Sequence, residues 1–208
     1  MGGWRWQFDS GSGFLGLATT PAPAQQCLVD ASRTQIGVTL GYDPSYVRLA
    51  YPGGDVPLES GVCTDVVIRA YRAVGIDLQK AVHEDMAAHF SSYPRNWGLR
   101  TTDRNIDHRR VPNLQRFFSR HGLSLGSDGA DADYLPGDLV TWRLPAGVPH
   151  IGIVSDRVSA AGTPLVVHNI GAGAREEDVL HEFEITGHYR YRPEGLVPAC
   201  TEGPPAAD

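Results

Sequence analysis

The chain has 208 residues, of which 41% are hydrophobic, which is enough to build one domain around a full core. Its formal net charge of −6 gives no general electrostatic reason to bind nucleic acid or an anionic membrane. The sequence has no internal repeat and no apolar run long enough to span a bilayer. We therefore expect one globular domain with no nucleic-acid partner and no membrane span.

The two ends of the chain differ from its middle. Residues 1–26 hold a short apolar stretch before small residues, which indicates a flexible leader or a weak secretion signal. Residues 193–208 are rich in Pro, Ala and Gly and are expected to form a flexible tail, which leaves 27–192 as the single domain. Cys27 and Cys200 lie near the two ends and could pair in an oxidising compartment, while two unrelated free thiols are the alternative.

Helical periodicity dominates the first part of the folded region. Asp77 is a good N-cap for one helix, Pro112 suits the first turn of another, and Gly122 closes it. Residues 42–46 form a turn with two aromatic rings, and 91–111 form a polar connection of the kind that often lines sites. The predicted helices cover 28–36, 64–74, 78–90 and 112–121.

Strand periodicity takes over in the second part. Alternating and β-branched residues predict strands over 137–142, 150–154, 164–169, 183–185 and 188–191. Helices followed by an antiparallel sheet make an α+β domain.

Cys63 lies at the start of the predicted helix that begins near Thr64. Unpaired backbone N–H groups and the positive end of the helix dipole meet at such a position. Both favour a thiolate, so we expect the pKa of this thiol to be lowered. The alternative is a small buried hydrophobe, because free cysteine is among the most buried residue types.

Two histidines on successive predicted strands could serve this thiol. If His168 lies opposite Gly152 in a hairpin, His150 and His168 share one face as diagonal neighbours, and a slip of one residue separates them. In the favourable register, Cys63 attacks a carbonyl, His150 takes and returns the proton, and His168 orients His150.

Several motifs now resemble a known family. Residues 137–140 (Gly-Asp-Leu-Val) and 150–154 (His-Ile-Gly-Ile-Val) are similar to the pattern of NlpC/p60-like cysteine peptidases, which cut bacterial cell-wall peptides. More closely, the stretch from about Gln35 to Tyr191 resembles the bacterial family called domain of unknown function 1287. The matching motifs lie at 51–57, 61–65, 83–86, 105–114, 168–171 and 187–191.

The resemblance implies a papain-like NlpC/p60-type core over 27–192, with Cys63 as nucleophile, His150 as base and His168 as third member. It also implies that Tyr51 lies near the thiol. The chain departs from the peptidase pattern around the cysteine, where Val62 and Thr64 replace the Asp and Ser that help bind the free amine of the substrate. Specificity for the usual D-glutamyl–diamino acid bond therefore does not carry over.

A different set of polar residues could bind the substrate. Asp65, Asp107, Arg109 and Arg110 could together bind a zwitterionic peptide, because Arg holds a carboxylate by two parallel hydrogen bonds. Asn169, which follows His168 in its motif, joins this candidate set.

These features predict a thiol hydrolase, a peptidase or amidase that cuts an amide bond in a peptidoglycan stem peptide or similar peptide. The alternatives are a non-catalytic binding module for wall peptides and an acyl or peptidyl transferase that forms a thioester. No cofactor is expected, and His83 and His89 do not have the spacing of a metal site. Such a protein is expected in the periplasm or secreted, or exported by another route into rival cells, where an inhibitor or immunity protein would be a further partner.

Overall fold

The computed structural model describes residues 23–193. The predicted leader and tail therefore lie almost entirely outside the described residues, and so does Cys200. The first helix, α1 (Pro23–Arg33), begins inside the segment predicted as a leader and ends earlier than the sequence pattern indicated.

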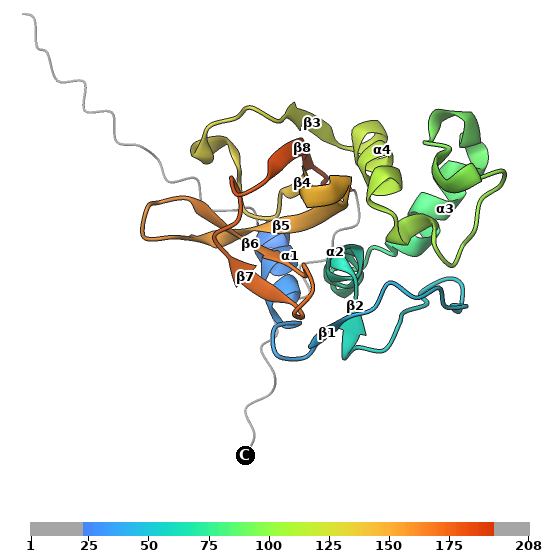
Figure 1. Ribbon diagram of the computed structural model, residues 1–208, viewed down its shortest axis with the longest axis horizontal. Coiled ribbons are helices and arrows are strands. Elements are labelled where there is room, and N and C mark those ends of the chain that lie inside the picture. The colour runs from blue at the N-terminus through green and yellow to red at the C-terminus, as the bar shows by residue number, and fades with distance from the viewer. Residues whose placement is uncertain (1–22, 194–208) are drawn as a thin grey trace, which may run out of the picture.

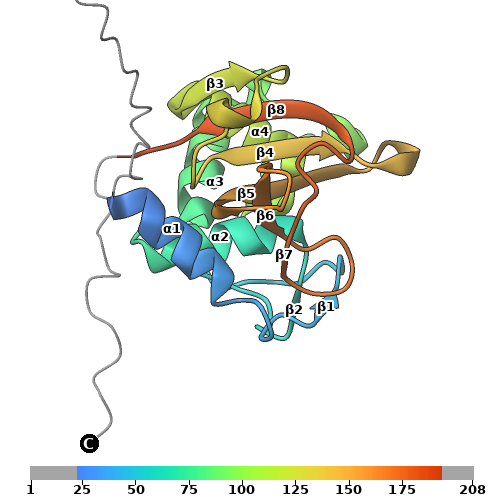
Figure 2. The same ribbon diagram turned by 90° about the vertical axis from the view of Figure 1, so that its left-hand side faces the viewer.

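The prediction of an α+β domain is confirmed. One antiparallel sheet has the strand order β3-β8-β4-β5-β6-β7. Helices α1 and α2 lie along one face of this sheet, while α3 and α4 stand beside it (Figures 1 and 2). The helices are α1, α2 (Cys63–Ala73), α3 (Leu78–Ala88) and α4 (Val111–His121). The strands are β3 (Leu123–Gly126), β4 (Leu139–Arg143), β5 (Pro149–Val158), β6 (Pro164–His168), β7 (Arg175–Glu177) and β8 (Glu184–Arg190).

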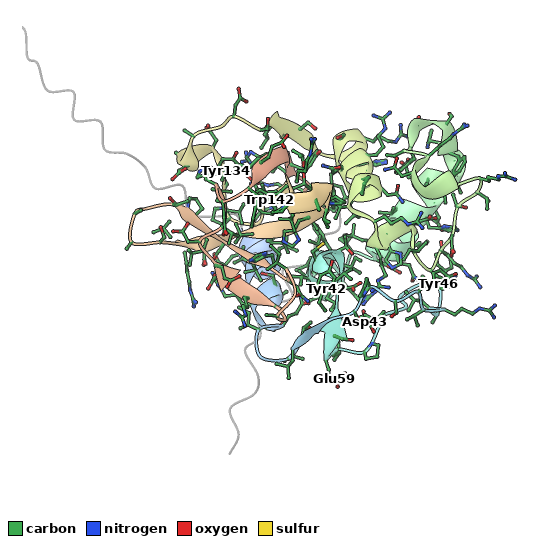
Figure 3. The ribbon with its side chains drawn as sticks, in the orientation of Figure 1. Tyr42, Asp43, Tyr46, Glu59, Tyr134 and Trp142 are labelled. Atoms are coloured by element: carbon green, nitrogen blue, oxygen red, sulfur yellow. The ribbon has the colours of Figure 1, made fainter. Side chains whose placement is uncertain are left out.

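The core lies on both faces of the sheet because alternate residues of its central strands point to opposite sides. On the helix side, Ile151 and Ile153 of β5 pack with Val67 and Tyr71 of α2. On the other side, Trp142 is buried in a second cluster that also contains Tyr134 (Figure 3). The sheet is thus held between α2 and this second cluster, and β5 is fixed in its middle.

The local signals for the helix starts hold. The side chain of Asp77 accepts hydrogen bonds from the backbone N–H groups of Gln79 and Lys80 and caps α3. At the start of α2, Asp65 accepts the N–H of Val62 at 2.7 Å, which fixes the turn that enters the helix. No helix within residues 23–193 is both long and apolar enough to cross a bilayer.

The strand predictions differ from the structure in three ways. β5 continues to Val158, whereas the predicted strand ended at residue 154. The pair predicted over 183–185 and 188–191 is one continuous strand, β8, which bridges a bulge opposite Thr141 and Trp142 of β4. The short strands β1 (Gly41–Tyr42), β2 (Ser60–Gly61), β3 and β7 were not predicted, because two to four residues are too few to display a period. Of these, β1 and β2 pair in parallel beside the start of α2 (Figure 1).

Candidate active site

Cys63 is the first residue of α2 and lines a pocket of about 190 Å³. The side chain is 3% exposed, and among the described residues it is the free cysteine. The walls come from β1, from the segment that leads into α4 and from the start of β5. They include Tyr42, Pro44, Ile106, Arg109, Arg110 and Pro149.

Three groups contact the sulfur of Cys63. The phenol of Tyr42 reaches it from β1, which runs just below α2 (Figure 3), and the backbone N–H groups of Thr64 and Ile151 also donate to it. The Ile151 contact places the thiol directly against β5, one residue from His150. The fold thus places Cys63 against the residue that follows His150, although the cysteine and this histidine are 87 positions apart in the chain.

The expected lowering of the Cys63 pKa is wrong for the free protein. Burial raises the pKa of the thiol to about 11, and the negative charge of Asp65 adds to the effect. Hydrogen bonds from Ile151, Thr64 and Tyr42 oppose the shift without reversing it. The helix start does supply N–H donors, as the sequence argument held, but excluding water from the sulfur costs the charged form more.

Of the two registers that the sequence left open, the structure has the one that puts both histidines on one face. Ile153 pairs with Val167 and Val154 with Val166, and the continuation of this register puts Gly152 opposite His168. The Nε2 atom of His150 lies 2.8 Å from Nδ1 of His168, and both rings are buried. One hydrogen bond therefore joins the two imidazoles across β5 and β6.

Both histidines are held in their neutral form. Burial lowers the pKa of His150 to about 3, and the charge of His168 adds to this. Burial also lowers the pKa of His168, although Glu177 acts in the opposite direction. Within the described part of the chain, no hydrogen bond joins Cys63 to His150. Such contacts are often long in ligand-free enzymes and shorten when substrate binds.

Asp65 and Arg109, both predicted to bind substrate, form an ion pair with each other. Arg109 donates from Nε and Nη2 to the two carboxylate oxygens of Asp65, each at 2.9 Å, and both side chains are buried. Arg109 also donates to the backbone carbonyls of Asp43 and Ser45. The pair therefore ties the start of α2 to the turn that forms one wall of the pocket.

The other predicted substrate residues are spread over different places. Arg110 lines the pocket. Asn169 lies close to the site, but its amide donates to the backbone carbonyls of Gly41 and Gly61, so it positions β1 and β2. Asp107 is fully buried and accepts hydrogen bonds from His83 and from the N–H of Asp103, away from the pocket.

Tyr51 does not occupy the place that the resemblance implied. Its hydroxyl donates to Glu84 and its ring packs edge-on against His83, outside the described lining of the pocket. Tyr42 takes the position beside the sulfur. In the loop between β1 and β2, Pro44 is the last residue that lines the pocket, and Tyr51 further along contacts α3.

Two residues at the site escaped the sequence argument. Tyr42 stood in a turn noted only for its aromatic rings, and nothing in the sequence linked that turn to Cys63. Glu177 accepts a hydrogen bond from Nε2 of His168 at 3.0 Å. The charged run Arg175–Glu177 was visible in the sequence, but only the pairing of β7 with β6 connects it to His168.

No three His, Cys, Asp or Glu side chains among residues 23–193 gather in a way that could hold a metal ion.

Comparison with known proteins places the chain among relatives. "Uncharacterized protein YijF" of Escherichia coli (strain K12) is 60% identical over 164 residues, which make up 79% of this chain and 80% of that protein. Among solved structures, NlpC1 from Trichomonas vaginalis matches with a TM-score of 0.45 and 15% identity. The match covers 83% of this chain and 46% of that one, so the chain spans about half the length of that protein. At this TM-score the likeness carries no argument about function.

The sequence profile described as "Domain of unknown function (DUF1287)" matches residues 29–191, which include every residue of the candidate site. The resemblance inferred from the motifs is confirmed, and the chain belongs to the DUF1287 family.

Proposed function

We propose that this chain is a thiol hydrolase that cuts an amide bond in bacterial cell-wall peptides. One observation carries the proposal: a cysteine at a helix start lines a pocket and contacts β5, whose His150 is hydrogen-bonded to His168 of β6. A structural cysteine would need neither the pocket nor the histidines.

The proposed reaction uses these groups in sequence. The sulfur of Cys63 bonds to the carbonyl carbon while its proton passes to Nδ1 of His150. In this proposal the backbone N–H of Cys63 and the hydroxyl of Tyr42, which contacts the sulfur, would donate to the oxyanion. The carbon–nitrogen bond then breaks, the amine leaves with the proton from His150, and water hydrolyses the thioester.

The substrate class is drawn from the motifs and from the pocket. The resemblance to NlpC/p60-like peptidases favours a stem peptide of peptidoglycan, and a periplasmic or exported protein would meet that polymer. Arg110 lines the pocket and could contact a peptide carboxylate there.

A non-catalytic binding module is the second candidate, and a specific observation favours it. The thiol is 3% exposed and burial raises its pKa to about 11, so few molecules carry the thiolate before substrate binds. Under this reading the pocket would hold a wall peptide without cutting it.

The test is to incubate the purified protein with intact peptidoglycan and follow soluble fragments by mass spectrometry. Cys63→Ala and His150→Gln serve as matched variants, and circular dichroism checks that each is folded. Fragments released by the wild type alone support the hydrolase, and their masses identify the bond. Sedimentation with peptidoglycan without release supports the binding module, and adducts formed with an added amine would mark a transferase.

A further inference from the structure

A chain of hydrogen bonds runs from the candidate site to the edge of the sheet. Nε2 of His150 meets Nδ1 of His168 at 2.8 Å, and Nε2 of His168 meets a carboxylate oxygen of Glu177 at 3.0 Å. The three residues lie on β5, β6 and β7, which are neighbours in the sheet (Figure 1). His168 therefore has a hydrogen-bond partner at each ring nitrogen, and His150 has one at Nε2.

The carboxylate of Glu177 fixes which group donates and which accepts in each of these hydrogen bonds. An ionised carboxylate only accepts, so Nε2 of His168 must carry the proton, and Nδ1 of this neutral ring must hold a lone pair. That lone pair accepts from Nε2 of His150, which leaves Nδ1 of His150 without a proton. Because burial keeps both rings neutral, each ring carries a single N–H proton, and its position is the one assigned above.

We propose that Glu177 is a positioning residue that fixes both histidines as Nε2–H tautomers and so prepares Nδ1 of His150 to accept the Cys63 proton. The proposal rests on the proposed function for the role of that proton, but the tautomers themselves can be measured without any activity.

The opposite tautomers are unfavourable in this geometry. They would place a lone pair of His168 against a carboxylate oxygen, so that two acceptors face each other at the 3.0 Å separation. Arg175 lies 3.7 Å from the other oxygen of Glu177 and forms an ion pair with it. Glu182 also acts on His168 by its charge, but it makes no hydrogen bond with that ring.

The chain also has a defined role when the proton moves. The thiol proton forms a new bond to Nδ1 of His150, and the imidazolium keeps its Nε2–H bond to His168. The proton then passes to the leaving amine, which restores the starting tautomers. Glu177 changes no bond in this cycle, so its removal is expected to lower kcat while leaving KM within about twofold, as for residues that orient another group.

The experiment is nitrogen-15 NMR of histidine-labelled protein, in which protonated and unprotonated ring nitrogens have distinct shifts. His150→Gln and His168→Gln assign the signals. Glu177→Ala removes the acceptor, Glu177→Gln keeps an acceptor oxygen without the charge, and Glu182→Gln removes a nearby charge without the hydrogen bond. We expect Nε2–H tautomers for both rings in the wild type and in Glu182→Gln, and mixed tautomers in Glu177→Ala with restoration in Glu177→Gln.

The outcomes separate this inference from the proposed function. Unchanged tautomers in Glu177→Ala, or Nδ1–H in either wild-type ring, would overturn the role of Glu177 even if Cys63-dependent hydrolysis is found. If hydrolysis is found, kcat in Glu177→Ala should fall by about 10- to 100-fold. Absent hydrolysis with the expected tautomers would reject the proposed function and leave the positioning role standing.

Discussion

Replacing Arg109 by Met tests whether this residue stabilises the fold through its ion pair with Asp65 or serves to bind substrate. The substitution keeps a long apolar side chain but leaves the Asp65 carboxylate buried without its partner. The side chains of Arg109 and Asp65 are 2% and 4% exposed, so solvent does little to screen the pair. Breaking such a buried pair costs about 3–5 kcal/mol.

Thermal unfolding followed by circular dichroism measures this cost. For a domain of this size, each kcal/mol lowers Tm by about 2–4 °C, so Arg109→Met should lower it by about 6–20 °C. Arg143→Met is the matched control, because Arg143 and Glu184 are 59% and 62% exposed and 3.6 Å apart. That exposed pair should contribute less than about 1 kcal/mol.

A second variant isolates the buried charge. Asp65→Asn combined with Arg109→Met removes both charges and keeps an acceptor for the N–H of Val62, so it should recover much of the lost stability. Equal losses in Arg109→Met and Arg143→Met would refute the reasoning. Arg109 would then be a candidate ligand for a substrate carboxylate, as the sequence argument held.

Three further predictions concern the thiol, the sheet and acid stability. The pKa of Cys63 is about 11 against an ordinary 9.0, so its thiolate fraction at neutral pH is about a hundredfold lower than that of an ordinary cysteine. The rate of alkylation of Cys63 by iodoacetamide should therefore rise about tenfold per pH unit from pH 7 to 9. A plateau of this rate in that range would contradict the prediction. Gly152→Ala would put a Cβ 2.5 Å from Val166 and should cost about 1–3 kcal/mol in urea unfolding, with loss of any hydrolysis that depends on the neighbouring histidine pair. Burial raises the pKa of Asp85, but hydrogen bonds, the strongest from Arg120, outweigh it and hold the pKa below its usual 3.8. The contribution of the ionised Asp85 carboxylate to the free energy of unfolding is therefore full above pH 3.8 and is lost as the pH falls. The difference in the free energy of unfolding between the wild type and Asp85→Asn should disappear in acid unfolding curves.

The parts of the site that could be predicted are those with a local sequence signal. Cys63 at a helix start follows from helical periodicity and the preceding glycine turn. The sequence allowed the observed register of β5 and β6, in which both histidines share one face, but it left open a slip of one residue that would separate them. These arguments need only residues that are close in sequence or on adjacent strands.

The parts that could not be predicted depend on chain tracing and on burial. The path of the loop after Pro44 decides that Tyr42, and not Tyr51, meets the sulfur. To predict that Asp65 and Arg109 bind each other, one must know that the segment before α4 returns to the start of α2. The pKa of Cys63 depends on how completely the pocket excludes water, which a helix-start signal does not contain.

The strand β7 has a consequence beyond its place in the hydrogen-bond chain. It forms one edge of the sheet, and such edges can pair with other molecules and cause aggregation. Here the edge strand is three residues long and all of them, Arg175, Glu176 and Glu177, are charged, which discourages such pairing. Solubility and orientation of the histidines therefore depend on the same short segment, and substitutions that neutralise it are expected to impair both at once.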